Sequence, residues 1–398
     1  MTSTAKVDPF APARLGPVSL RNRIIKSATF EGVVPDALVT DELIDFHRRV
    51  AAGGAGLTTV AYLAVAPEGR TQAECIWLRR EAVPGLARLV DAVHAEGGAV
   101  AGQLGHAGPV ANPKSNRAKS LAPSKMFNPL ALRRIHAATD AAIARITEDY
   151  GRGAALMEES GFDSIEVHLG HGYLLSAFLS PRFNKREDQW GGSLENRARF
   201  PRQVVKAVRA AVGDRLAVTA KLNMTDAMPG GFKIDESLEF AGMLDRDGGL
   251  DGLELTGGSS FGNPMYLFRG PAPREDFAKT LPLHARIGFK LMGEKLMPDY
   301  PWEEGFFRND ARRFLEALDV PIILLGGINK LETIQSSLDE GFSFVAMGRA
   351  LLREPDLINR MAAGQADDST CIHCNRCMPT IYSGTRCVLD HPDPIIVA

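Results

Sequence analysis

Two observations on the sequence predict an α/β fold of the (β/α)₈ TIM-barrel type. Eight short apolar runs rich in β-branched residues recur along the chain, and stretches with helical spacing lie between them. Strands that alternate with helices form a parallel sheet, because each crossover helix packs on that sheet. Eight strands favour a closed barrel over a doubly wound sheet, which would usually carry a glycine-rich turn after its first strand; residues 23–31 have no such turn.

The expected elements follow one another in a regular order. The strand runs are Arg23–Ala28, Ala55–Ala61, Ala99–Leu104, Ser164–His168, Leu216–Leu222, Gly252–Leu255, Pro321–Leu325 and Phe342–Met347. Apolar residues at helical spacing predict helices over Asp41–Ala52, Pro84–Glu96, Ile146–Ser160, Asn196–Val212, Ile234–Arg246, Asn309–Leu318 and Lys330–Glu340. Several of these helices end where a glycine suits a left-handed cap, at Gly97, Gly161 and Gly341.

Two segments are longer than the minimal repeat, Gly105–Ala138 and Gly257–Phe307. Each follows a strand, so we expect both at the catalytic face of the barrel, where such loops shape substrate pockets. We expect residues 1–365 to form the barrel and residues 366–398 to form a short cysteine-rich C-terminal extension.

Composition and charge restrict the class of protein. The 398 residues are 45% hydrophobic and 24% charged, which is ordinary for a globular chain with a large core. The formal net charge of -2, without blocks of like charge, favours small-molecule partners over nucleic acid or a membrane. No basic segment with a following apolar run opens the chain, so we expect a cytoplasmic protein, and we leave a homo-oligomer open.

Four of the five cysteines lie close together near the C-terminus, at Cys371, Cys374, Cys377 and Cys387. This distribution favours metal ligation in a reducing compartment over scattered disulfides. Four thiolates at short spacing suit a [4Fe–4S] cluster or a structural zinc ion, and free or redox-active thiols are the remaining interpretation.

The densest polar cluster, residues 164–173, begins as a buried strand and ends with His168, His171 and Tyr173. Two imidazoles beside a phenol can hold a carbonyl oxygen by hydrogen bonds and deliver a proton nearby. One alternative is a set of satisfied polar residues at a strand end. A zinc site built on His-x-x-His is disfavoured, because no third ligand is close and the context is not helical.

A longer stretch around this cluster resembles the Old Yellow Enzyme family of flavin-dependent ene-reductases. The resemblance rests on Gly161–His168, His171–Leu175, Phe178–Pro181, Asn184, Arg186 and Gly191–Arg197. Supporting motifs are Leu15-Gly16, Asn22-Arg23-Ile24, Gln103–Gly108, Ala122–Ser124, Gly326-Gly327 and Met347-Gly348-Arg349. Motifs in this order, covering residues 8–360, are far more specific than any single short pattern.

The resemblance implies FMN as cofactor, NAD(P)H as reductant and an activated alkene as substrate. His168 and His171 would bind the electron-withdrawing group of the alkene, and Tyr173 would donate the proton. Hydride from the flavin then reaches the β-carbon, and the two imidazoles stabilise the charge that builds on oxygen. The absence of a Rossmann fingerprint agrees with a ping-pong cycle, in which nucleotide and alkene use one face in turn.

The resemblance also implies how the flavin is held. The amide of Gln103 would pair with the pyrimidine edge, and Lys221 would face N1 and O2 and favour the anionic reduced flavin. A structural salt bridge is the alternative for Lys221, since an unpaired buried lysine is costly. Backbone groups and an arginine after the last two strands would bind phosphate, at Gly326, Gly327, Gly348 and Arg349.

Two strand ends depart from the family pattern. The first strand ends in Lys26–Glu31 instead of the usual Pro-Met-Thr, so we expect Ala28 and Thr29 to approach the flavin through backbone atoms. The second strand ends in Ala61-Tyr62 instead of a motif with glutamate, and Tyr62 either stacks near the ring or only lines the pocket.

The cysteine group is similar to the ligands of the family's iron–sulfur branch, which includes dienoyl-CoA reductases and amine dehydrogenases. The interval from Cys377 to Cys387 is shorter than that branch leads us to expect. We therefore expect an FMN-dependent NAD(P)H oxidoreductase of the ene-reductase type. The alternatives are an FMN dehydrogenase that passes electrons from an amine or other reduced substrate to a carrier, and a barrel that only binds flavin.

Overall fold

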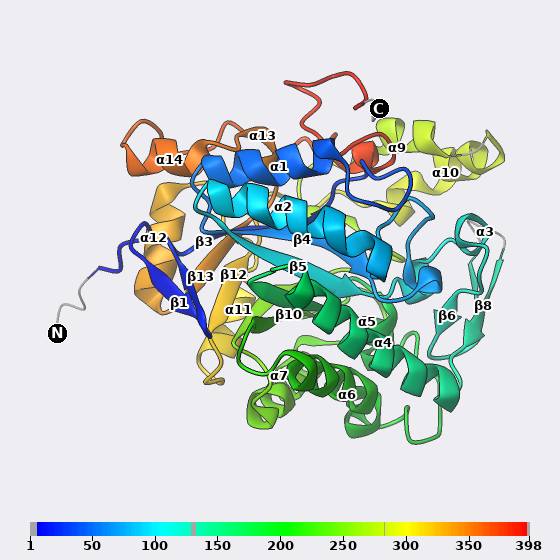
Figure 1. Ribbon diagram of the computed structural model, residues 1–398. Helices are drawn as coiled ribbons and strands as arrows, with labels where there is room; N and C mark the ends of the chain where they lie inside the picture. The colour runs from blue at the N-terminus through cyan, green and yellow to red at the C-terminus, as the bar shows by residue number, and fades with distance from the viewer. Residues whose placement is uncertain (1–5, 129–132, 282, 396–398) are drawn as a thin grey trace.

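The computed structural model describes residues 6–128, 133–281 and 283–395, and its centre is a closed barrel of parallel strands (Figure 1). The strands are β3 (Ile24–Phe30), β4 (Leu57–Ala64), β5 (Ala99–Gly105), β9 (Ser164–Leu169), β10 (Ala217–Asn223), β11 (Gly252–Thr256), β12 (Ile322–Leu325) and β13 (Phe344–Met347). They close in the order β10-β11-β12-β13-β3-β4-β5-β9, which confirms the predicted (β/α)₈ barrel.

Helices cover the outside of the barrel, and each predicted helix is present. They are α1 (Asp41–Ala52), α2 (Val83–Ala95), α4 (Asp140–Glu159), α6 (Leu194–Val212), α7 (Ile234–Asp247), α11 (Arg308–Leu315) and α12 (Leu331–Glu340). Helix α4 begins at Asp140 instead of Ile146, because the Thr139 side chain caps it by accepting the Ala142 N–H. Gly97, Gly161 and Gly341 take positive φ angles of 73°, 85° and 118°, as their places at helix ends predict.

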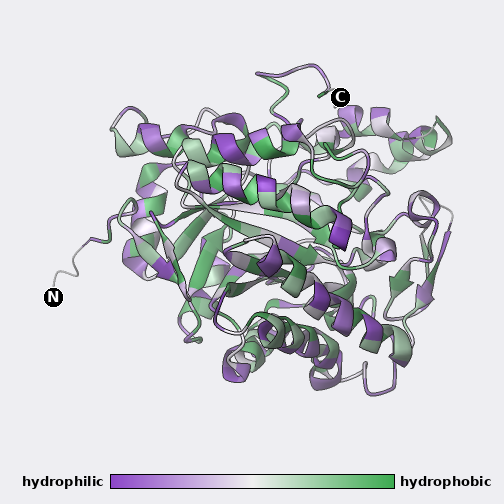
Figure 2. Cartoon of the chain, in the orientation of Figure 1, coloured by the Kyte–Doolittle hydropathy of each residue, from purple (hydrophilic) through white to green (hydrophobic). Residues whose placement is uncertain are grey.

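The barrel has two apolar layers. One lies between the strands and the surrounding helices, and the other fills the interior of the barrel. Figure 2 shows hydrophobic residues along the strands and hydrophilic residues on the outer sides of the helices. The inner layer includes Ile25, Leu57 and Phe344 near the amino ends of their strands. An antiparallel hairpin of β1 (Ala13–Leu15) and β2 (Val18–Leu20) closes this end by adding Leu15 and Leu20 to that layer.

The opposite, carboxyl end of the barrel carries the two long segments, which contain ordered elements that periodicity did not predict. After β5 come η3 (Gly108–Val110), α3 (Pro113–Asn116) and a three-stranded sheet in the order β6-β8-β7: β6 (Leu121–Ala122), β8 (Arg133–Ala137) and β7 (Met126–Asn128). After β11 come α8 (Met265–Phe268), α9 (Arg274–Thr280) and α10 (Leu283–Leu296). Shorter helices follow other strands: α5 (Leu174–Leu179), α13 (Arg349–Arg353) and α14 (Leu357–Ala362).

The C-terminal segment packs on the barrel. The Thr385 N–H donates to the Glu31 carbonyl oxygen at 2.7 Å, and the Asn375 side chain donates to the Arg269 carbonyl oxygen at 2.7 Å. The short helix η4 (Met378–Tyr382) lies between these contacts. The boundary at residue 365 stays a prediction. None of the described helices has the length and apolar character needed to cross a membrane.

Truncation of Leu20 tests the closure of the barrel's amino end. Leu20 is 1% exposed and lies in the inner apolar layer, so Leu20→Ala should lower the free energy of unfolding by about 2–5 kcal/mol. Denaturant unfolding of the purified variant measures this loss. Ser19→Ala, on the exposed face of the same strand, is the matched control and should change stability by less than about 0.5 kcal/mol. Equal stability of the two variants would contradict the closure.

Candidate functional site

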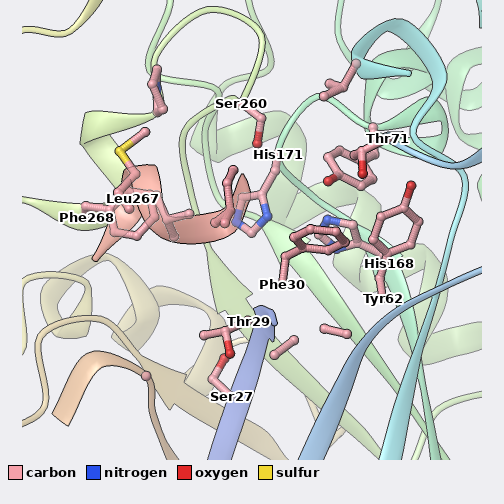
Figure 3. A pocket seen from close by; sticks show the side chains of 18 of the residues that line it. Ser27, Thr29, Phe30, Tyr62, Thr71, His168, His171, Ser260, Leu267 and Phe268 are labelled. Atoms are coloured by element: carbon pink, nitrogen blue, oxygen red, sulfur yellow. The ribbon is translucent and has the colours of Figure 1, made fainter. Parts of the chain in front are cut away.

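A cavity of about 560 Å³ opens at the carboxyl ends of the barrel strands, where enzymes of this fold place their chemistry. Its volume lies in the range of small-molecule and cofactor sites. Figure 3 shows side chains from separate strands and loops converging on it, among them Thr29, Tyr62, His168 and His171. The lining includes each residue predicted for catalysis or flavin binding: Ala28, Thr29, Tyr62, Gln103, His168, His171, Tyr173, Lys221, Gly326, Gly327, Gly348 and Arg349.

Three of these rings form one cluster at the end of β9. The ring centroids of His168 and His171 are 4.9 Å apart, and those of His168 and Tyr173 are 4.8 Å apart. A tight turn after the strand brings them together, because His171 takes a φ of 61° and Gly172 a φ of 74°. Positive φ is strained for histidine, so the turn needs support from its surroundings.

That support comes from the next two strands of the barrel. The backbone N–H of His171 donates to the Asn223 side chain of β10 at 3.0 Å. The Nε2 atom of His171 lies 3.0 Å from the Thr256 hydroxyl of β11. The first hydrogen bond holds the backbone of the turn, and the second fixes the ring orientation of His171 at the edge of the cavity.

Both imidazoles are neutral at physiological pH. Burial, with the charge of Lys221, lowers the pKa of His171 to about 3. Burial, with His171 and Lys221, lowers the pKa of His168 well below its ordinary value. A neutral imidazole has one N–H donor and one acceptor nitrogen. The buried Nδ1 of His168 has no hydrogen-bond partner among the described residues.

Lys221, on β10, lies at the centre of a buried polar network. Its Nζ is 3.0 Å from a carboxylate oxygen of Glu166 on β9 and 3.0 Å from one of Glu254 on β11. It is also 3.2 Å from the Ser27 hydroxyl of β3. Although burial alone would lower the pKa of Lys221, the two carboxylates raise it above its ordinary value, so the ammonium stays charged.

Between β11 and β3, two strands of this network, lie β12 and β13, which are followed by glycine-rich turns and Arg349. Arg349 is bonded to the carbonyl oxygens of Phe268 and Arg269 and to the Asn375 side chain, and it pairs with no carboxylate among the described residues. Gly326 and Gly327 have φ angles of 112° and 72°, and a Cβ atom on Gly326 would lie 2.5 Å from Phe307. The Phe307 ring and the positive φ angles therefore require glycine at this turn, whereas a Cβ atom on Gly348 would meet nothing within 4 Å, so the backbone beside the Arg349 charge is open to an anionic group.

Comparison with known proteins agrees with this geometry. A family model described as "NADH:flavin oxidoreductase / NADH oxidase family" matches residues 8–248. A 4,4'-dithiodibutanoate disulfide reductase of Rhodococcus erythropolis is 54% identical over 389 residues, covering 98% of this chain and 96% of that protein. The chain belongs to the NADH:flavin oxidoreductase family.

Other members of the family are more distant. A multifunctional alkene reductase/demethylase of Caballeronia cordobensis is 28% identical over 94% of this chain, but the match spans only 52% of that protein. Morphinone reductase in complex with tetrahydroNAD has a TM-score of 0.70 and 27% identity, covering 92% of this chain and 93% of that one. The resemblance to the Old Yellow Enzyme family is thus confirmed, with FMN as cofactor and NAD(P)H as reductant.

The cavity fits FMN by the chemistry of its donors. Lys221 offers a positive charge and Gln103 an amide, while the Gly326-Gly327 turn and Arg349 offer a place for phosphate. The Gln103 side-chain nitrogen donates to Glu166 at 2.7 Å, which joins the amide to the Lys221 network and sets its orientation. When bound, the flavin would be held between these two groups of residues.

The two departures at the strand ends have structural explanations. The Thr29 hydroxyl accepts from Lys26 Nζ at 3.0 Å and donates to Glu31 at 3.0 Å, so it is engaged on the side of α1. The Tyr62 hydroxyl donates to the Gly69 carbonyl oxygen at 2.7 Å, and its ring lies edge-on to Tyr173 with centroids 5.3 Å apart. Tyr62 therefore packs against the Tyr173 ring as part of the cavity wall.

The cysteines predicted as metal ligands, Cys371, Cys374, Cys377 and Cys387, lie in the C-terminal segment. Cys377 lines the cavity, and burial raises the pKa of its thiol to about 12. In the described part of the chain, no three Cys, His, Asp or Glu side chains are grouped so that they could hold a metal ion. The assignment of the four thiols to an iron–sulfur cluster or zinc ion stays a prediction, and no role in the chemistry is assigned to such a group.

Several functional positions were not named from the sequence, notably Ser27, Glu166 and Glu254, which contact Lys221. The sequence contains a signal for Glu166 and Ser27, because side chains two residues apart on a strand point to the same face. Glu166 is two residues before His168, and Ser27 is two residues after the inward-facing Ile25. Glu254 is at the same level of the barrel, since it pairs in register with Lys221.

The depressed pKa of His171 predicts a pH-dependent stability. In the unfolded chain an ordinary histidine binds a proton below about pH 6.5, whereas His171 binds one only near pH 3. Between these values the unfolded state holds more protons, so stability falls as the pH falls. His171→Asn should reduce this slope by about 1 kcal/mol per pH unit in urea unfolding between pH 4 and 6. An unchanged slope would show that His171 is not buried in its neutral form.

Proposed function

We propose that this chain reduces the C=C bond of activated alkenes, such as enones, with NAD(P)H as reductant and FMN as cofactor. The observation that carries the proposal is the cluster of His168, His171 and Tyr173 in the same cavity as Lys221. The neutral imidazoles lie beside Tyr173, the candidate proton donor, and the Lys221 ammonium lies at the floor of the cavity. Reduction of an activated alkene needs hydrogen-bond donors, a proton donor and a reduced flavin in one cavity.

In this proposal each side chain has a separate task. FMN, when bound, supplies hydride to the β-carbon of the alkene. His168 and His171 donate hydrogen bonds to the substrate oxygen, which becomes negative as the β-carbon is reduced. The Tyr173 hydroxyl gives a proton to the α-carbon and regains it from solvent. One NAD(P)H and one proton are consumed for each alkene reduced.

Removal of the Tyr173 hydroxyl tests its role as proton donor. Tyr173→Phe should slow alkene reduction by two to four orders of magnitude, the usual loss for a missing general acid. Reduction of the flavin by NAD(P)H should stay nearly intact, because that half-reaction needs no proton on carbon. Stopped-flow absorbance separates the two half-reactions.

Tyr150→Phe is the matched control for this experiment. It also removes a tyrosine hydroxyl, but from the buried Tyr150 of α4, which does not line the cavity. The control should leave both half-reactions within a few-fold of the parent protein. If both half-reactions fall together in Tyr173→Phe, the assignment of Tyr173 as proton donor is wrong.

A second candidate is the reduction of organic disulfides. It is favoured by the 54% identity to the R. erythropolis enzyme, which is named for a disulfide that carries two carboxylates. Hydride on one sulfur would break the S–S bond and release the other sulfur as a thiolate. Protonation of that thiolate gives two thiols for each NAD(P)H and proton consumed. Tyr173 is close enough to the imidazole pair to supply that proton.

Reoxidation of the NAD(P)H-reduced protein distinguishes the two candidates. Under anaerobic conditions, cyclohex-2-enone and 4,4'-dithiodibutanoate are mixed separately with the reduced protein, and the return of the oxidised flavin absorption is followed. We expect fast reoxidation by the enone. Reoxidation by the disulfide alone would support the second candidate and refute alkene reduction, and reoxidation by neither would refute both.

A further inference from the structure

The cavity is lined by cations without carboxylates. Its described lining residues include Lys221, Arg349 and Arg133, but no Asp or Glu. Lys221 is paired with Glu166 and Glu254 behind the lining. Arg349 and Arg133, in contrast, pair with no carboxylate among the described residues, so the charge of these two arginines attracts anions. Two of the three cations have a place in the flavin site already described. Arg133 has none.

Strand β8 directs Arg133 into the cavity. Successive side chains of a strand point to opposite faces, and Arg133 and Ile135 both line the cavity. Arg134 and His136, between and after them, are exposed. Since β8 is the middle strand of the sheet β6-β8-β7, its pairing on both sides fixes this orientation.

The Arg133 guanidinium also has no partner among the residues that the structure describes. It is partly buried, and no hydrogen bond or ion pair joins it to another residue in the described part of the chain. The planar guanidinium offers five N–H donors in a geometry that matches a carboxylate. A partly buried charge of this kind, facing a cavity, has donors available for an anionic ligand.

Arg133 lies away from the residues that suit the FMN phosphate. The segment that carries it follows β5, whereas Gly326 and Gly327 follow β12. In the closed strand order β5 and β12 are on opposite sides of the barrel. In Figure 1, β8 stands at the right-hand edge, well apart from α13, which begins at Arg349. Arg133 therefore belongs to a different part of the cavity wall from the residues that suit the FMN phosphate.

We infer that Arg133 is a substrate-specificity residue that binds a carboxylate, so that the cavity takes acceptors bearing a carboxylate on the side away from the FMN phosphate. This inference rests on the proposed function, because it names the substrate class for the same cavity. The pair is charge-assisted and partly desolvated, which makes it stronger than a surface contact. The NADPH phosphate is the other anion that enters this cavity, and the experiment distinguishes it.

The test measures binding without turnover. Octanedioate, a saturated dicarboxylate, and its dimethyl ester are titrated into the oxidised FMN-loaded protein, and the flavin absorption change gives each Kd. Arg133→Gln should weaken octanedioate binding by about 10- to 100-fold, the effect of losing one hydrogen-bonded ion pair. Binding of the ester should change less than threefold. Because octanedioate cannot be reduced, the result is independent of whether alkenes or disulfides are the substrates.

Arg134→Gln is the matched control, since it removes the same charge one residue away on the exposed face. It should leave both Kd values unchanged. The inference is wrong if octanedioate does not bind the parent protein saturably, or if Arg133→Gln weakens acid and ester alike. It is also wrong if Arg133→Gln weakens NADPH but neither NADH nor octanedioate, because Arg133 would then hold the nucleotide phosphate.

Discussion

The buried ammonium of Lys221 is the interaction on which the site depends. It joins Glu166 of β9 and Glu254 of β11, while Ser27 of β3 and Gln103 of β5 complete the network. Five of the eight barrel strands are therefore linked by one set of hydrogen bonds beneath the cavity. A buried charge is tolerated only when it is paired and bonded in this way. The network explains why a lysine can be placed at the floor of an otherwise apolar barrel.

The imidazole cluster depends on the same region of the barrel. His171 is held by Asn223 and Thr256, which end the two strands that carry Lys221 and Glu254. The charge of Lys221 also helps to keep both imidazoles neutral, so they remain hydrogen-bond partners for a substrate oxygen and not competing cations. The polar floor and the polar wall of the cavity are thus parts of one arrangement.

Local patterns predicted most of the fold and the residues at the strand ends. Strand runs and helical periodicity depend on neighbouring residues, and the parallel barrel brings the strand ends to one face, so His168, Lys221 and Gln103 could be expected together. The sequence could not show that Arg133 enters the cavity or that Cys377 belongs to its wall. Those positions depend on contacts far apart in the chain, such as Asn375 with Arg269, which no periodicity reports.

The midpoint potential of bound FMN tests most directly whether the Lys221 charge faces the flavin. A positive charge near the ring stabilises the reduced, anionic flavin more than the oxidised form. Spectroelectrochemical titration of the FMN-loaded protein should therefore give a lower potential for Lys221→Met than for the parent chain, with Lys221→Arg close to the parent. Equal potentials in the parent and Lys221→Met would show that the ammonium does not act on the flavin and would contradict this account.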